Sequence, residues 1–143
     1  MKSKLTLFMT FLMLIFAAAC SDDSTGPGDL NQNDLEGTWD MTQYIYISSA
    51  NSSVTADIMQ LQGLGQTMVI NSNGSYTLTT TVQGQSFTSS GQFGFENGVV
   101  NSPDPNTTVT LDGNTLRMET SNTSYDFGSG DEPATARLVF TRR

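Results

Sequence analysis

The sequence predicts an all-β protein, a small antiparallel up-and-down barrel of about eight strands. Three observations predict this class: Thr, Ser, Val, Tyr and Phe dominate residues 35–143, apolar residues recur there at every second position, and Gly- and Asn-rich turns separate the alternating runs. A segment of this length supports one hydrophobic core and leaves no room for a second domain.

Two predicted strands show the alternation most clearly. The first covers residues 38–47, and another covers residues 75–83, where threonines occupy every second position. Because successive side chains of a strand point to opposite faces, one face of each strand should be buried and the other wet. The residues expected on the buried faces are Trp39, Met41, Ile45 and Ile47, then Tyr76, Leu78, Thr80 and Val82.

The later runs continue this pattern to the C-terminus. Gly and Asn in the turns between them supply the positive φ that tight hairpins require, so successive strands should pair as a meander. Tyr125 and Phe127 mark one more short strand, and residues 128–133 form a loop. The apolar positions of the other runs are Phe87, Phe93, Phe95, Val109, Leu111, Leu116, Met118, Ala134, Ala136, Leu138 and Phe140, and the turns are 71–74, 83–85, 97–98 and 112–114.

One stretch after the first strand departs from the period of two. Between Ser53 and Gly65, three apolar residues are spaced as on a helix, and Gly63 suits a helix end. We expect a short helix or ordered lid here, with an irregular loop as the alternative. The three apolar residues are Val54, Ile58 and Leu61.

The first twenty residues predict a lipoprotein signal peptide. Two lysines open the segment, an apolar run from Leu5 to Phe16 follows, and three alanines precede Cys20. This is the order of a secretion signal, and the apolar run is shorter than the roughly 20 residues that a membrane-spanning helix needs. The Ala-Ala-Ala-Cys ending resembles a bacterial lipobox. We therefore expect residues 1–19 to be removed and Cys20 to carry a lipid anchor.

Residues 20–34 are predicted to form a flexible tether, since they are rich in Gly, Ser, Asp and Asn and lack apolar periodicity. The start of this tether, Ser21-Asp22-Asp23, resembles an acidic tag that exports some Gram-negative lipoproteins to the cell surface. The expected location is the cell envelope, lipid-anchored in the outer membrane and exposed either to the periplasm or at the cell surface.

Composition argues against several function classes. After Cys20 the chain holds four arginines against fourteen acidic residues, a formal net charge of −10. We expect no nucleic-acid partner, because nucleic-acid-binding proteins carry a basic patch. The chain has no histidine, and its single cysteine is assigned to lipid, so we expect no enzyme, no cofactor and no transition-metal site. Residues 126–132 gather three carboxylates without the spacing of the helix-loop-helix calcium motif, and calcium binding there stays open.

Four segments resemble lipocalins and bacterial lipocalin-like lipoprotein domains. Residues 35–39, Leu-Glu-Gly-Thr-Trp, are similar to the Gly-x-Trp motif of their first strand. Residues 67–76 are similar to their strand, Asn-Gly turn and Tyr-bearing strand, residues 91–93 to their middle Gly-x-aromatic element, and residues 137–142 to their last strand. The resemblance covers most of the body and implies the barrel fold. The disulfide that lipocalins often carry is absent, and the chain is shorter than the larger members.

The resemblance also implies a structural role for two residues. In lipocalins a basic residue of the last strand packs over the opening tryptophan at the closed end of the barrel. Arg142 shares the phase of Phe140, so it is the candidate to cover Trp39, whereas Arg143 has the opposite phase. A desolvated cation over an indole contributes about 1 to 2 kcal/mol. The alternative is that both arginines form a frayed, solvated end.

The function that the resemblance implies is binding of a small hydrophobic or amphipathic molecule at the barrel mouth opposite Trp39, with residues 53–65 as a lid. By strand phase, Gln43, Thr80 and Ser89 face the interior, which favours a water-containing cavity because buried polar groups need partners. The alternative is a filled barrel, a non-catalytic structural or interaction lipoprotein that presents its loops to a protein or glycan partner. The candidate ligand-binding residues are Met41, Ile45, Met68, Ile70, Tyr76, Leu78, Phe93, Phe95, Leu116 and Met118.

Overall fold

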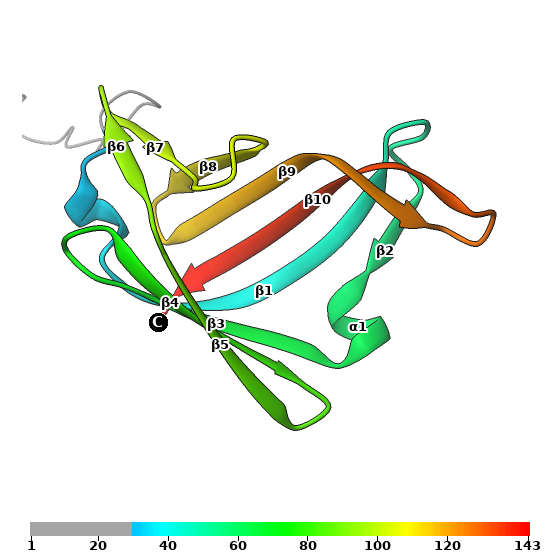
Figure 1. The fold of residues 1–143 in the computed structure, drawn as a ribbon, viewed down its shortest axis with the longest axis horizontal. Coiled ribbons are helices and arrows are strands. Elements are labelled where there is room, and N and C mark those ends of the chain that lie inside the picture. Colours follow the sequence, from blue (N-terminus) through cyan, green and yellow to red (C-terminus); the bar gives the residue numbers. More distant parts are fainter. Residues whose placement is uncertain (1–29) are drawn as a thin grey trace, which may run out of the picture.

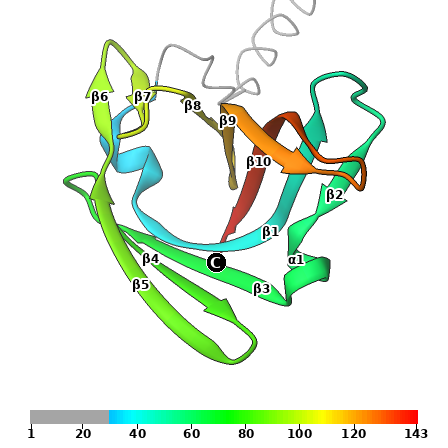
Figure 2. The ribbon, with the colours of Figure 1, turned by 45° about the vertical axis from the view of Figure 1, so that its right-hand side comes forward.

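The computed structural model describes residues 30–143 and shows one antiparallel sheet curled into a nearly closed barrel (Figures 1 and 2). The predicted signal peptide, Cys20 and most of the predicted tether lie outside the described residues. The elements in chain order are η1 (Gln32–Leu35), β1 (Gly37–Ser48), β2 (Thr55–Asp57), α1 (Ile58–Gln62), β3 (Leu64–Ile70), β4 (Ser75–Val82), β5 (Gln85–Gln92), β6 (Gly94–Glu96), β7 (Val99–Asn101), β8 (Thr107–Asp112), β9 (Thr115–Asp126) and β10 (Asp131–Arg142).

The strands follow a meander. Their order across the sheet is β5-β4-β3-β1-β10-β9-β8-β7-β6, and β2 pairs with β1 off this path. Only Phe93 separates β5 from β6, so one bent segment bonds β4 with its first part and β7 with its second. The chain itself thereby joins the two ends of the sheet. The predicted antiparallel up-and-down barrel is confirmed, with nine strands on the path in the described part of the chain.

The turns that the sequence predicted close the hairpins. Gln83 and Gly84 have φ of 50° and 82°, as a type I′ turn requires, and Asn97 and Gly98 have φ of 53° and 74°. In this geometry the turn twist matches the twist of the flanking strands, which is why β4 and β5 pair without an irregularity from Ser75 to Gln92.

The predicted short helix is α1. It begins after Asp57, whose side chain accepts a hydrogen bond from the backbone N–H of Gln60, and it ends at Gly63, which has a left-handed φ of 59°. Strand β2 precedes it and was not predicted, because three residues are too few to display a period of two. Tyr125, predicted to mark a separate short strand, belongs to the twelve-residue strand β9.

Two irregularities decide which side chains face the barrel interior. The register between β1 and β10 shifts between Met41 and Gln43, and the register between β9 and β10 shifts between Ala134 and Ala136. One extra residue in a strand exchanges the two faces beyond it. In β1, Tyr44 therefore lies opposite the inward Leu138.

The predicted inward positions of Gln43, Ile45 and Ile47 are wrong for this reason. Gln43 lies opposite Val139 and is exposed, and Ile45 lies opposite Arg137. The inward residues of the second half of β1 are Tyr44, Tyr46 and Ser48, which lie opposite Leu138, Ala136 and Ala134.

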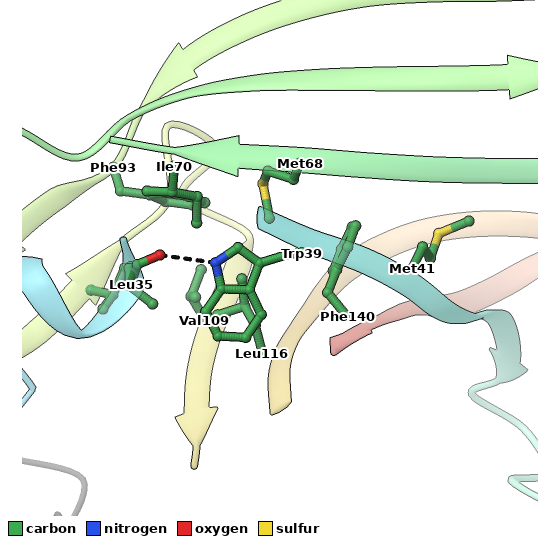
Figure 3. Packing of buried hydrophobic residues seen from close by; sticks show 10 residues of the cluster. Leu35, Trp39, Met41, Met68, Ile70, Phe93, Val109, Leu116 and Phe140 are labelled. Carbon is green, nitrogen blue, oxygen red and sulfur yellow. Dashed lines mark hydrogen bonds between the residues drawn. The ribbon is translucent and has the colours of Figure 1, made fainter. Parts of the chain in front are cut away.

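The hydrophobic core fills one end of the barrel. Trp39 lies at its centre with no exposed surface, and its indole N–H donates to the carbonyl oxygen of Leu35 over 2.9 Å (Figure 3). Helix η1 covers this end, because its last residue, Leu35, is fully buried and accepts the indole hydrogen bond. The buried members of the core are Leu35, Trp39, Met41, Met68, Ile70, Phe93, Val100, Val109, Leu116 and Phe140.

Candidate functional site

The end of the barrel that holds Trp39, which we call the closed end, is sealed by Arg142. The two residues are directly opposite in the β1–β10 register, and the Arg142 guanidinium carbon lies 4.6 Å from the centre of the indole. Its Nη2 donates to the carbonyl oxygen of Asp34 in η1. The strand phase of Arg142 predicted this position, and the contact ties the last strand to the first and to η1.

Arg143 points the other way, as its phase predicted. Its guanidinium forms an ion pair with Asp40, with 2.8 Å between Nη2 and Oδ1, and Asp40 also accepts a hydrogen bond from the hydroxyl of Thr67. The hydrogen bond from Arg143, followed by that from Thr67, holds the pKa of Asp40 below its usual value. Both terminal arginines are therefore bound, one inside the barrel and one outside it.

At the opposite end, which we call the open end, the interior is lined by an aromatic row made of Tyr44, Tyr46, Tyr125 and Phe127. The rings of Tyr46 and Tyr125 are stacked with their centres 4.6 Å apart, and Phe127 meets Tyr125 edge-on at 5.0 Å. The hydroxyls of Tyr44 and Tyr46 are 3.1 Å apart. Burial, and then the hydrogen bond with Tyr46, raise the pKa of Tyr44 above its usual value, so the Tyr44 hydroxyl stays protonated at neutral pH.

Apolar side chains continue the lining between this row and the core. Leu138 lies opposite both Tyr44 and Met118 in the sheet, and Leu78 comes from β4. All of them are only partly buried, although their strand positions face the interior. These inward side chains therefore keep part of their surface exposed, unlike the buried side chains around Trp39.

A polar pair lies across β3 and β4 near the same end. Gln66 is directly opposite Thr80, and its Nε2 donates to the Thr80 hydroxyl over 3.1 Å. The Gln66 Oε1 atom is buried and has no hydrogen-bond partner within residues 30–143. If the amide were turned over, its nitrogen would be the atom left without a partner, so one polar atom of Gln66 is unsatisfied in either orientation.

The ten predicted ligand-binding residues separate into three groups. Met41, Met68, Ile70, Phe93 and Leu116 are buried in the core at the closed end. Tyr76, Leu78, Phe95 and Met118 are partly buried and pack against that core, and Ile45 is on the opposite face of β1 from Met41. Of the predicted set, the structure brings only Leu78 and Met118 to the open end.

Sequence reasoning missed the residues that dominate the open end. Tyr44, Tyr46 and Tyr125 were assigned to no site, because the bulge at Thr42 leaves no compositional mark. The pairing of aromatics at positions 44 and 46 was the available signal, since two tyrosines at a spacing of two share a strand face. Gln66 falls in a segment without clear alternation, so its inward position depended on the register with β4.

Two hollows lie at the closed end instead. One, of about 270 Å³, is lined by Leu30 with residues 98–100 and 109–112, where β7 and β8 diverge beyond their single paired position. The other, of about 210 Å³, lies between η1 and Arg142. Both border Leu30, the first described residue, whereas the elements that line the open end are all described.

The first carboxylate of the acidic loop after β9, that of Asp126, is hydrogen-bonded to the backbone of the loop itself. Asp126 Oδ1 accepts hydrogen bonds from the backbone N–H groups of Gly128 at 2.7 Å and Gly130 at 2.9 Å. These bonds lower the pKa of Asp126. No group of three metal-ligating side chains converges anywhere in residues 30–143.

No protein-family model matches the chain, and the curated proteins include no sequence similar to it. Within the described residues there is no helix with the length and apolar character to cross a membrane.

Proposed function

We propose that this protein is a lipid-anchored barrel of the cell envelope that binds a small amphipathic molecule at its open end. The anchor is proposed from the sequence, where Cys20 follows an apolar leader and three alanines. The binding function is proposed from one observation: the side chains around Trp39 are buried, while beyond Met41 the inward side chains of the barrel remain partly exposed.

The lining selects the chemistry of the ligand. Leu138, Met118 and the aromatic row offer an apolar wall, and methionine and aromatic side chains adapt well to flexible apolar chains. The unsatisfied amide atom of Gln66 and the Tyr44 and Tyr46 hydroxyls offer hydrogen bonds to a polar group. The Gln66 amide carries no charge, and the raised pKa of Tyr44 keeps its hydroxyl protonated at neutral pH. A neutral head group such as a hydroxyl fits this site better than an anion, which the acidic protein would repel.

The test is native mass spectrometry of the chain from Ser21 onward, purified from bacteria without detergent and weighed before and after solvent extraction. A fatty alcohol, the fatty acid of equal length and the matching alkane are then titrated by calorimetry. We expect the alcohol to bind most tightly. Gln66→Leu should reduce the preference for alcohol over alkane about tenfold, which corresponds to one lost hydrogen bond of about 1.4 kcal/mol.

Gln43→Leu is the matched control, because this glutamine lies on the outer face of β1 and should leave all three affinities unchanged. The proposal fails if the protein carries no extractable mass and binds none of the three probes. Equal loss in the two glutamine variants would also contradict the assignment of Gln66 to the site.

A further inference from the structure

Strand β5 is an edge strand that is exposed along almost its whole length. It pairs with β4 on one side, and its other side has no strand partner among the described residues. Seven of its eight residues are exposed, and Phe87 is 59% exposed although its strand position faces the barrel interior. Figures 1 and 2 show the β4–β5 hairpin reaching away from β9 and β10, and no helix or strand of residues 30–143 runs along this edge.

Natural edge strands usually carry a device that prevents pairing, such as a lysine, a proline, a bulge or an inward charge. Strand β5, Gln-Ser-Phe-Thr-Ser-Ser-Gly-Gln, has no charge and no proline, and its register with β4 is unbroken. Instead it is rich in Ser, with a Thr and a Phe that suit a pleated strand. The edge is therefore competent to accept another strand.

The distribution of charge along the chain favours a second copy of this protein as the partner of β5. Between Asp57 and Glu96 the sequence has no charged residue, whereas the chain after Cys20 carries a formal net charge of −10. Two copies of such an acidic protein repel each other on most approaches. When the β5 strand of one copy faces the β5 strand of the other, no acidic residues are brought together, because β3, β4 and β5 all lie in the uncharged stretch.

The direction of the backbone groups sets the register. The two-residue turn at 83–84 makes Val82 and Gln85 a hydrogen-bonded pair, so the odd residues of β5 bond to β4. The Phe93 N–H, which donates to the Gly74 carbonyl oxygen over 3.0 Å, continues this phase. The N–H and C=O groups of Ser86, Thr88 and Ser90 therefore point to the free edge.

We propose that two copies of this protein associate through antiparallel pairing of their β5 strands about a twofold axis at Thr88. Thr88 then exchanges both backbone hydrogen bonds with the partner's Thr88, and Ser86 and Ser90 pair crosswise. The two Phe87 rings become diagonal neighbours on the interior face, a separation that aromatic side chains span. Such a self-complementary contact is closed, so assembly stops at the dimer.

A disulfide test on the full chain measures this register directly. Thr88→Cys should form a disulfide-linked dimer under mild oxidation, because Cα atoms of a hydrogen-bonded antiparallel pair lie about 5.5 Å apart, within the range that a disulfide bridges. Thr77→Cys is the control, since Thr77 is exposed on β4 of the same hairpin but one strand away from the edge. The linked peptide is identified by mass, and the parent chain is oxidised in parallel to account for Cys20.

A second variant separates edge pairing from hairpin folding. Thr88→Pro removes an N–H that points to the free edge and leaves the β4–β5 ladder intact, so the far-ultraviolet circular dichroism should not change. Sedimentation equilibrium in mild detergent should show the dimer weakened at least tenfold. A parent chain that stays monomeric, a dimer unaffected by Thr88→Pro, or equal crosslinking at positions 77 and 88 would each overturn the proposal.

Discussion

The two ends of this barrel are built from the same strands but are packed in different ways. At the closed end, Trp39 and Phe140 are almost fully buried and Arg142 covers the indole. At the open end, Tyr46 and Tyr125 stack on each other with their surfaces partly exposed. We infer that stability is concentrated in the first region and that the second is free to serve binding, because loosely packed sites lose little when they change their neighbours.

The largest effect should come from truncating one aromatic side chain at each end. Trp39→Ala should lower the free energy of unfolding by about 3–5 kcal/mol, because it leaves a cavity and an Arg142 cation without its indole. Tyr46→Ala should cost about 1–2 kcal/mol, since that ring is partly solvated and mainly loses its stacking on Tyr125. Urea unfolding measures both values. Equal losses would mean that the two ends are equally packed.

Alanine substitutions at two glycines should have a smaller effect on the free energy of unfolding than the two aromatic truncations. A Cβ at Gly91 would overlap the Tyr76 hydroxyl oxygen and lie 2.5 Å from the ring carbon that bears it, because the Tyr76 ring covers this glycine across the β4–β5 register. Gly91→Ala should therefore cost about 1–3 kcal/mol through overpacking.

Gly65, on the outer face of β3, provides the control. A Cβ there meets no atom within 4 Å, so Gly65→Ala should change the free energy of unfolding by no more than about 0.5 kcal/mol. Thermal unfolding of the two variants side by side gives the answer. A destabilised Gly65→Ala would show that alanine costs stability in these strands without any clash, and the loss in Gly91→Ala could then not be assigned to overpacking.

The smallest expected effect is the contribution of Asp126, in the loop after β9, to the pH dependence of stability. The pKa of Asp126 is lowered in the folded protein from its ordinary 3.8 by the N–H groups of Gly128 and Gly130, so its stabilising contribution is complete above about that pH and is lost as pH falls through the folded value. Asp126→Asn should give a small, constant decrease in melting temperature between pH 7 and 5. The difference should vanish in stronger acid. A difference in melting temperature that grows on acidification would contradict a stabilising role for the ionised Asp126 carboxylate.

Predictions from the sequence succeeded where local pattern and global fold agree. The alternation in β4 and β10, the positive-φ turn at Gln83 and Gly84, and the helix end at Gly63 are each set by a few neighbouring residues. The candidate site was predicted less well. Its residues depend on which way β1 faces after Thr42, and a one-residue bulge decides that without a compositional signal.

The sequence by itself determined an all-β barrel, the strand phase that puts Arg142 on the face of Trp39, and a strongly acidic chain with an uncharged middle, because periodicity and charge are properties of the order of residues. The tertiary structure alone decided that Tyr44 and Tyr46, rather than Ile45, line the open end, that Gln66 keeps an unsatisfied polar atom, and that β5 lies at an edge. These features depend on register between strands distant in the chain, and register is fixed by the packing of the whole barrel.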